Sequence, residues 1–131
     1  MDETSKKLID AASDLLNSRG DGVRHTVAAA ANTKAGKVFT TLNVSHFTGG
    51  PCAEIAALTK LISEGEDPIR MVTVGDQGRG VIALCGRCRQ VFLDYYPDIG
   101  IIMPDGNIKT PKQLLPDAYS WFDQQVVSKS E

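Results

Sequence analysis

The chain has 131 residues, the length of one compact domain, and 42% of them are hydrophobic. Its net charge is −2, from 14 Lys and Arg against 16 Asp and Glu. Without a basic run it lacks the stripe typical of nucleic-acid-binding proteins, so nucleic acid is not an expected partner. No segment reaches the about 18 consecutive apolar residues of a membrane span, and residues 1–8 lack the apolar core of a signal peptide.

Three cysteines, an odd number, fit a reducing compartment better than a disulfide framework. We therefore expect a single cytoplasmic domain over residues 1–131, with a polar tail after about residue 122.

The first elements that the pattern predicts are a helix and a strand hairpin. Apolar residues recur at helical spacing over residues 4–18, and two glycines at 20 and 22 end that segment. The apolar positions are Leu8, Ile9, Ala11, Ala12, Leu15 and Leu16. Two strands are predicted over 26–31 and 37–44, and the turn between them makes them antiparallel neighbours.

Two helix–strand units follow the hairpin. Gly49-Gly50-Pro51 breaks the loop that precedes the first of these helices. The predicted order is a loop over 46–51, a helix over 52–64, a buried strand over 69–74, a loop over 75–80, a short strand or approach segment over 81–84, a helix over 85–96, a strand over 99–103 and a short helix after 111. Strands alternating with helices predict a mixed sheet covered on both faces.

The three cysteines point to a metal site. Cys85 and Cys88 are three residues apart and share one helix face, while Cys52 begins another predicted helix. Helix starts favour negative charge and lower thiol pKa values, so both starts can present thiolates. A catalytic Zn²⁺ site uses three protein ligands and leaves the fourth position to water, which this set matches.

Glu54 follows Cys52 by two residues and lies in the first turn of that helix. A carboxylate there can take a proton from water and hand it to a substrate nitrogen, while zinc lowers the pKa of the water towards about 7. Three thiolates leave an excess negative charge on the metal. Arg87 and Arg79 are the residues that we expect to offset it by donating hydrogen bonds to the thiolates.

Two other interpretations of the cysteines stay open. A Cys-x-x-Cys pair can be a redox site, although a third cysteine followed by Glu54 is not required for that chemistry. A closed structural zinc site, with His25 or His46 as fourth ligand, would make the chain a non-catalytic zinc-binding domain. The open site is favoured because Glu54 would have no role in a closed one.

Cys-Ala-Glu at 52–54 together with Cys-Gly-Arg-Cys-Arg-Gln at 85–90 resembles the cytidine deaminase superfamily. Residues 43–54 and 79–82, and the tail with Leu114, Leu115 and Pro116, resemble its blasticidin S branch more narrowly. The resemblance runs from about residue 23 to residue 121. It implies a three-layer α/β/α sandwich around a five-stranded mixed sheet, usually assembled as a homotetramer.

The resemblance also implies an activity and site residues. Cys52, Cys85 and Cys88 would bind one zinc ion per subunit, with Glu54 as the proton shuttle. The reaction would convert the 4-amino group of a cytosine nucleoside to a carbonyl and release ammonia. The substrate contacts would come from Asn43 and Ala53 and from two tail aromatics that help close the site, Tyr119 and Trp121.

The expected substrate follows from positions at which this chain departs from the usual superfamily pattern. Ordinary cytidine deaminases carry Asn-x-Glu, and that Glu holds the ribose hydroxyls; here position 45 is Ser. We therefore expect blasticidin S or a similar aminoacyl nucleoside as substrate, with a role in antibiotic resistance; cytidine or deoxycytidine in pyrimidine salvage is the alternative. Leu84 and Ala29 stand where the blasticidin branch has Pro and Ser.

Overall fold

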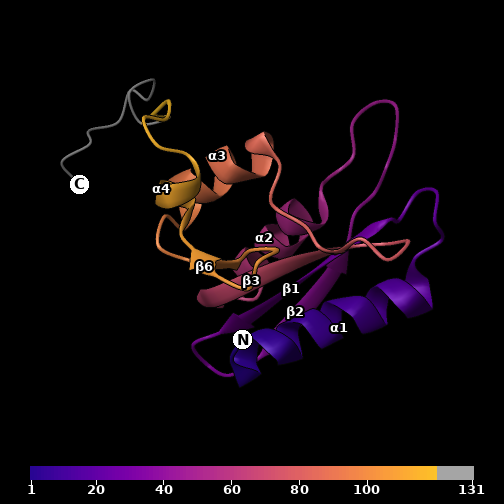
Figure 1. Ribbon diagram of the computed structural model, residues 1–131. Coiled ribbons are helices and arrows are strands. Elements are labelled where there is room, and N and C mark those ends of the chain that lie inside the picture. The colour runs from indigo at the N-terminus through magenta and orange to yellow at the C-terminus, as the bar shows by residue number, and fades with distance from the viewer. Residues whose placement is uncertain (121–131) are drawn as a thin grey trace.

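A computed structural model of the protein describes residues 1–120. Its α-helices and β-strands form three layers, with a mixed sheet between helices (Figure 1). The elements are α1 (Glu3–Arg19), β1 (Val27–Thr33), β2 (Val38–Leu42), α2 (Ala53–Ser63), β3 (Pro68–Gly75), β4 (Gly80–Val81), α3 (Gly86–Tyr95), β5 (Gly100–Ile102), β6 (Ile108–Lys109) and α4 (Pro111–Leu114). Within residues 1–120, no helix is both long and apolar enough to cross a membrane.

The sheet has the order β2-β1-β3-β5-β6, and the short strand β4 pairs with β3 outside this path. The β1–β2 hairpin and the β1–β3 pair are antiparallel, whereas β3 and β5 run parallel. The predicted mixed sheet is therefore confirmed, including the parallel pair. Five strands form the path, and β4 brings the sheet to six.

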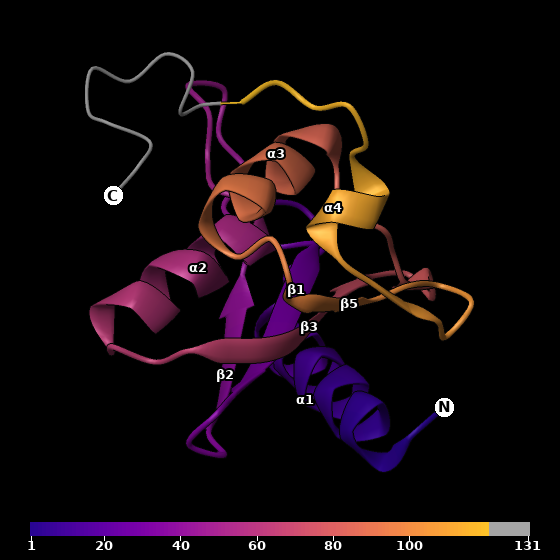
Figure 2. The same ribbon diagram turned by 90° about the vertical axis from the view of Figure 1, so that its left-hand side faces the viewer.

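Strand β1 shows why helices cover both faces of the sheet. Its four consecutive alanines, residues 28–31, are all fully buried. Because side chains alternate along a strand, Ala28 and Ala30 pack under α1, while Ala29 and Ala31 pack under α2 and α3. Figure 2 shows α1 on one side of the sheet and α2 and α3 on the other. These small side chains leave room for bulkier helix residues on both sides.

Helix α1 is amphipathic and well capped. Leu8, Ala12 and Leu16 are buried at spacings of four residues and pack on the sheet with Val72. The Asp2 carboxylate accepts a hydrogen bond from the Ser5 N–H at 2.8 Å and so caps the first turn.

The predicted helices agree with the structure to within one residue at each end, apart from the C-terminal helix, for which only the start was predicted. The segment 81–84, left open between a strand and an approach to a helix, contributes only Val81 to β4. Strand β6 was not predicted, because two residues show no periodicity. It pairs with β5 and leads into α4, whose Thr110 and Gln113 form a capping box.

Candidate metal centre and active site

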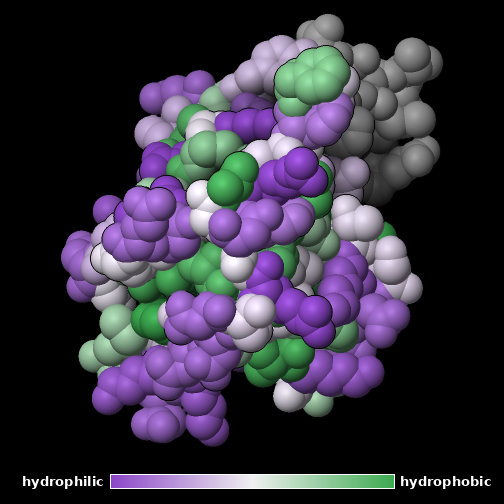
Figure 3. All heavy atoms as spheres, turned by 90° about the vertical axis from the view of Figure 1, so that its right-hand side faces the viewer, coloured by the Kyte–Doolittle hydropathy of each residue, from purple (hydrophilic) through white to green (hydrophobic). Residues whose placement is uncertain are grey.

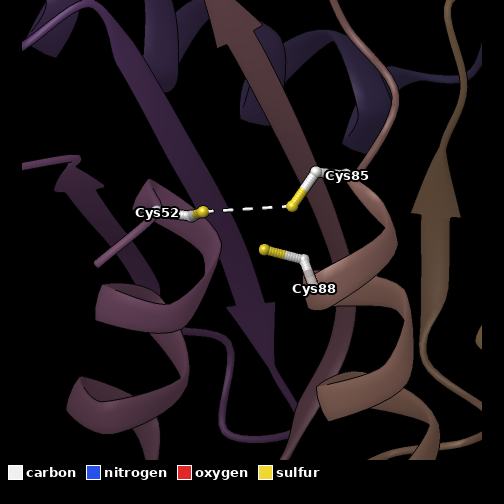
Figure 4. Close-up of side chains that lie close together, drawn as sticks. All are labelled: Cys52, Cys85 and Cys88. Carbon is white, nitrogen blue, oxygen red and sulfur yellow. Dashed lines mark hydrogen bonds between the residues drawn. The ribbon is translucent and has the colours of Figure 1, made fainter. Parts of the chain in front are cut away.

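Helices α2 and α3 begin beside each other, and each begins at a cysteine. Cys52 is the N-cap of α2, Cys85 is the N-cap of α3, and Cys88 lies in the first turn of α3. Figure 4 shows the three sulfur atoms pointing toward one another from the two helices. All three thiols are free, and their sulfurs lie within 4.8 Å of one another, with 4.0 Å between Cys52 and Cys85.

These distances fit a metal better than a disulfide. A disulfide needs sulfurs about 2.0 Å apart, whereas thiolates about 2.3 Å from a tetrahedral zinc ion stand about 3.8 Å from each other. Among residues 1–120, no histidine or carboxylate joins the three cysteines as a further ligand. Nδ1 of His25 is hydrogen-bonded to the Asn43 carbonyl, and Nδ1 of His46 to Thr48. The cluster therefore offers three ligands and an open fourth position.

The three thiols differ in their surroundings. Burial is the largest single effect on Cys85, but backbone N–H groups of Cys88 and Arg87, with the neighbouring thiols, hold its pKa below the usual value. Burial raises the pKa of Cys52, and burial together with the charge of Glu54 raises that of Cys88. A cation placed between the sulfurs would lower the pKa values of Cys52 and Cys88, since it stabilises thiolates.

Glu54 stands beside this cluster in the first turn of α2 and is only 4% exposed. Burial raises the pKa of its carboxyl, although hydrogen bonding to Cys88 opposes the rise. The Thr73 hydroxyl on β3 also faces it and lowers its pKa, but lies beyond hydrogen-bond distance. A carboxyl with a raised pKa can both accept and return a proton near neutral pH.

A cavity of about 390 Å³ opens onto Cys52, Glu54 and Cys85. Its other walls come from β1, the loop between β2 and α2, and the segment before α3; they are lined by Val27, Asn43, Val44, Ser45, His46, Gly50, Pro51, Ala53, Ile82 and Ala83. The predicted substrate contacts Asn43 and Ala53 are thus next to the predicted metal ligands. Figure 3 shows the face of the molecule toward which this loop projects, with apolar residues exposed among polar ones.

Hydrogen bonds hold the loop between β2 and α2. The Asn43 side-chain oxygen accepts from the backbone N–H groups of Thr26, at 2.7 Å, and Val27, at 3.0 Å. The Val44 N–H donates to the Pro51 carbonyl, which closes the loop. A side chain at Gly50 would collide with the Val44 carbonyl, because its Cβ would lie 1.8 Å from that oxygen. Gly50 is therefore required by close backbone approach.

The two arginines are placed differently from our expectation. The Arg79 guanidinium donates to the carbonyls of Thr26 and Asp76 and to the Asp76 carboxylate at 2.9 Å. The Arg87 backbone, not its guanidinium, contributes a hydrogen bond to Cys85. Neither guanidinium donates to a thiolate in the described part of the chain. Asp76 lies three residues before Arg79 and captures that side chain within the same turn.

The tail aromatic Tyr119 is not brought to the cavity. Tyr119 is 58% exposed and lines a different hollow beside α3, and its carbonyl accepts a hydrogen bond from Gln90. Trp121 lies outside the described residues. Leu84 and Ala29 are buried in the core under α2 and α3, and neither lines the cavity.

Arg89 is a structural residue that the sequence did not reveal. Its guanidinium donates to the carbonyls of Leu84, at 2.9 Å, and Leu114, at 3.1 Å. It therefore fixes the residue before Cys85 and ties α4 to α3. The Thr41 hydroxyl similarly donates to the Ala53 carbonyl at 2.8 Å and fixes the start of α2. The bonds to Leu84 and Ala53 position the neighbouring cysteines through backbone carbonyls, for which no sequence motif exists.

The sequence matches no family model. It is 32% identical over 136 residues to a Dictyostelium discoideum protein named "Probable cytidine deaminase", covering 98% of this chain and 91% of that relative. It is 24% identical over 127 residues to blasticidin-S deaminase of Bacillus cereus, covering 87% of this chain and 91% of that relative. Among solved structures, cytidine deaminase from Mycobacterium tuberculosis matches with a TM-score of 0.77 at 31% identity, covering 91% of this chain and 99% of the other.

The relatives and the geometry agree on the class of protein. The matches to the Dictyostelium and mycobacterial proteins extend over nearly the whole of both chains and exceed 30% identity. The three clustered cysteines and the buried glutamate are the residues on which the sequence resemblance rested. The chain belongs to the cytidine deaminase superfamily of hydrolytic deaminases.

Proposed function

We propose that the protein is a zinc-dependent hydrolase that converts the 4-amino group of a cytosine nucleoside to a carbonyl and releases ammonia. The observation that carries this proposal is the placement of Glu54, a buried carboxyl, beside three converging thiols, of which those of Cys52 and Cys85 line the same cavity as Glu54. Hydrolysis at C4 of cytosine requires water to be activated and two proton transfers, and these residues are suited to both tasks.

Cys52, Cys85 and Cys88 would hold one zinc ion per subunit. When bound, zinc supplies a Lewis acid that makes water more acidic at neutral pH. Two of the three cysteines line a cavity, and within residues 1–120 no fourth protein ligand joins them, which favours a catalytic over a closed structural site. The backbone N–H groups at the start of α3 donate hydrogen bonds to Cys85 and so stabilise the negative charge of its thiolate.

Glu54 would move the protons. As a carboxylate it takes a proton from the attacking water, and as an acid it gives the proton to the ring nitrogen N3. It then transfers the second proton to the departing amino group. Within the described residues, Glu54 is the sole carboxyl that lines the cavity, so the task falls to it. Burial, which raises its pKa, brings proton uptake and release closer to neutral pH.

Blasticidin S or a similar aminoacyl nucleoside is our first candidate substrate. Ser45 stands on the cavity wall where the superfamily pattern has the ribose-holding glutamate, and the Bacillus relative carries the blasticidin name. Cytidine or deoxycytidine is the second candidate, since two relatives above 30% identity are named "Probable cytidine deaminase" and "Cytidine deaminase".

The test is ammonia release and loss of the cytosine absorbance from each compound. Zinc-loaded protein is incubated separately with blasticidin S, cytidine and deoxycytidine, and kcat/KM is compared. We expect turnover of at least one of them and the highest kcat/KM for blasticidin S. Failure to deaminate any of the three would overturn the proposal. A preference for cytidine would keep the proposed reaction but make cytidine the preferred substrate.

Glu54→Gln separates an enzyme from a non-catalytic zinc domain. It keeps the shape and the cysteines, so zinc should still bind, while kcat falls by about 10³-fold or more because no group remains to move the protons. Glu64→Gln, on the exposed C-terminal end of the same helix, is the matched control and should keep full activity. Equal activity of the two variants would favour the non-catalytic interpretation.

Assembly and location are part of the same proposal. We propose a homotetramer, as the resemblance implies, and a cytoplasmic location, which the three free cysteines support because reducing compartments preserve thiols. Light scattering of the zinc-loaded protein measures the first. A mass of one or two subunits at micromolar concentration would contradict it.

A further inference from the structure

One buried hydroxyl beside the cysteine cluster has no hydrogen-bond partner. Within residues 1–120, the buried polar residues are Ser5, Thr33, Glu54 and Thr73. The Ser5 hydroxyl accepts a hydrogen bond from the Arg70 guanidinium, and the Thr33 hydroxyl accepts one from the Lys37 backbone N–H. The Thr73 hydroxyl has no such partner in that part of the chain. It faces the Glu54 carboxyl, on which the proposed reaction depends.

The position of Thr73 follows from the alternation of side chains along β3. Val72 and Val74 pack under α1, whereas Met71 packs under α2 and α3. Thr73 therefore lies on the side of the sheet at which α2 and α3 begin. Its cross-strand neighbour on β1 is Ala29, whose side chain has no polar atom. Thr73 is only 1% exposed, so its hydroxyl is closed off from solvent on the side that carries Glu54.

The strand itself does not need a hydroxyl at this position. Valine has nearly the same shape as threonine, also favours strands, and would bury no polar atom. The backbone of Thr73 already contributes to the cavity wall, because its carbonyl accepts a hydrogen bond from the Ile82 N–H at 2.9 Å. A valine would keep that bond. The buried hydroxyl therefore costs stability without serving the sheet, which indicates that it serves Glu54.

Glu54 would depend on this hydroxyl more strongly once the cysteines hold a metal. Two side-chain donors face its carboxyl, the Cys88 thiol and the Thr73 hydroxyl. A thiol that binds zinc is deprotonated, so Cys88 could no longer donate a hydrogen bond. A threonine hydroxyl keeps its hydrogen. Besides the backbone N–H of Glu54, Thr73 is then the donor that remains to the carboxylate among the described residues.

We propose that Thr73 is a positioning residue, whose hydroxyl donates a hydrogen bond to one oxygen of the Glu54 carboxylate and so keeps the other oxygen directed into the cavity. This rests on the proposed function, in which Glu54 moves two protons. A carboxylate held at one oxygen does not turn about its last bond, so its other oxygen stays beside the reacting atoms. Thr73 acts only through Glu54, because it does not line the cavity itself.

Thr73→Val and Thr73→Ser separate orientation from packing. Valine keeps the shape and removes the donor, whereas serine keeps the donor and removes a methyl group. We expect Thr73→Val to lower kcat for the best cytosine nucleoside by at least about 10-fold, with KM within about 3-fold of wild type, because a hydrogen bond to a charged group is lost. Thr73→Ser should keep kcat within about 3-fold. A merely structural residue would give the opposite order, since serine leaves a cavity and valine does not.

Thr59→Val is the matched control. Thr59 lies on the exposed side of α2, and its hydroxyl donates to the Ile55 carbonyl at 3.1 Å. The same exchange of a hydroxyl for a methyl group is thus made on the helix that carries Glu54, but away from its carboxyl. We expect kcat, KM and zinc content to stay at wild-type values. Metal analysis of all three variants checks that the cysteine cluster is intact.

Melting temperatures test the contact without turnover. Thr73→Val is introduced into the zinc-loaded wild-type protein and into zinc-loaded protein that carries Glu54→Leu, which removes the carboxyl. Without the carboxyl the Thr73 hydroxyl has no acceptor, so Thr73→Val should raise Tm. With Glu54 present, the same substitution also removes the hydrogen bond to the carboxylate. The shift in Tm should then be less favourable by at least about 2 °C.

The outcomes separate this inference from the proposed function. A Thr73→Val protein with wild-type kcat, or a Thr73→Ser protein that loses as much kcat as Thr73→Val, would overturn the positioning role. Equal shifts in Tm with and without the Glu54 carboxyl would do the same. If the shifts differ as expected but the wild-type protein releases no ammonia from any cytosine nucleoside, the contact between Thr73 and Glu54 is supported and the proposed reaction is wrong.

Discussion

The two faces of the sheet are built from the same strands but serve different purposes. On the α1 face, Leu8, Ala12 and Leu16 pack on alanine and valine side chains, and the buried Ser5 hydroxyl accepts a hydrogen bond from Arg70. On the opposite face, the layer under α2 and α3 also contains Cys88, next to the buried carboxyl of Glu54. The three thiols and the Glu54 carboxyl thus lie on one side of the sheet.

The difference shows how a small domain can carry a reactive site without losing its core. A buried carboxyl costs stability when it ionises, and three crowded thiols repel one another once they ionise. The closed α1 face can offset that cost, since its contacts need not leave room for a substrate. Changes on the two faces should therefore separate activity from stability.

The largest effect is expected for Cys88→Ser, on the reactive face. Serine has a similar shape but is a poor zinc ligand, so the cluster loses one of its three ligands. We expect zinc content to fall well below one per subunit and kcat/KM for the best cytosine nucleoside to fall by at least about 10³-fold. Metal analysis after dialysis and an ammonia assay measure both. A zinc-replete, fully active Cys88→Ser protein would remove Cys88 from the ligand set.

On the closed face, Leu8→Ala should reduce stability alone. Leu8 is 1% exposed, and its truncation leaves a cavity between α1 and the sheet. We expect the free energy of unfolding in urea to fall by about 2–5 kcal/mol. Zinc content and kcat of the folded fraction should stay at wild-type values, because α1 contributes nothing to the cavity above Cys52 and Glu54. A loss of kcat without a loss of stability would contradict this division.

A pair of serine substitutions on neighbouring residues compares the faces directly. Ala28 lies between Leu42 and Val74 on the adjacent strands, whereas Ala29 lies between Thr41 and Thr73. A hydroxyl at position 28 finds only apolar cross-strand neighbours, so Ala28→Ser should cost about 1–3 kcal/mol. Ala29→Ser should cost less by at least about 1 kcal/mol, since the buried Thr73 hydroxyl lacks a partner. Urea unfolding of both variants gives the difference, and equal losses would mean that Thr73 gains no bond.

The sequence predicted well what depends on local patterns. Helix α1 follows from the spacing of Leu8, Ala12 and Leu16, and the metal cluster follows from cysteines placed at two helix starts. Helix α1 leaves a periodicity in the sequence and the metal cluster leaves a motif, and both can be recognised locally. The parallel pairing of β3 and β5 followed from the helix between them.

What the sequence could not predict depends on long side chains and on backbone carbonyls. Arg79 is six residues from Cys85, yet its guanidinium is bound by Asp76, because an acceptor in the same turn competes with a more distant thiolate. Arg89 binds Leu84, five residues before it, and Leu114, 25 residues after it, and both partners accept through their backbone carbonyls. Thr73 on β3 faces Glu54 on α2 through the packing of that helix on the sheet, which is a property of the assembled fold.

The smallest expected effect is on the metal-free protein and comes from Glu54 itself. Burial raises the pKa of this carboxyl above its value of about 4.5 in the unfolded chain, so its ionisation disfavours the folded state. For an acid with a raised pKa, the cost is absent at low pH, where both states are protonated, and appears as the pH rises above the unfolded value. Glu54→Gln should therefore raise Tm relative to wild type at pH 7.5, and the gap should shrink towards pH 4. Glu64→Gln, in which an exposed carboxylate is lost, should show no such trend, and a lower Tm for Glu54→Gln at pH 7.5 would mean that the ionised carboxylate is stabilised by the fold.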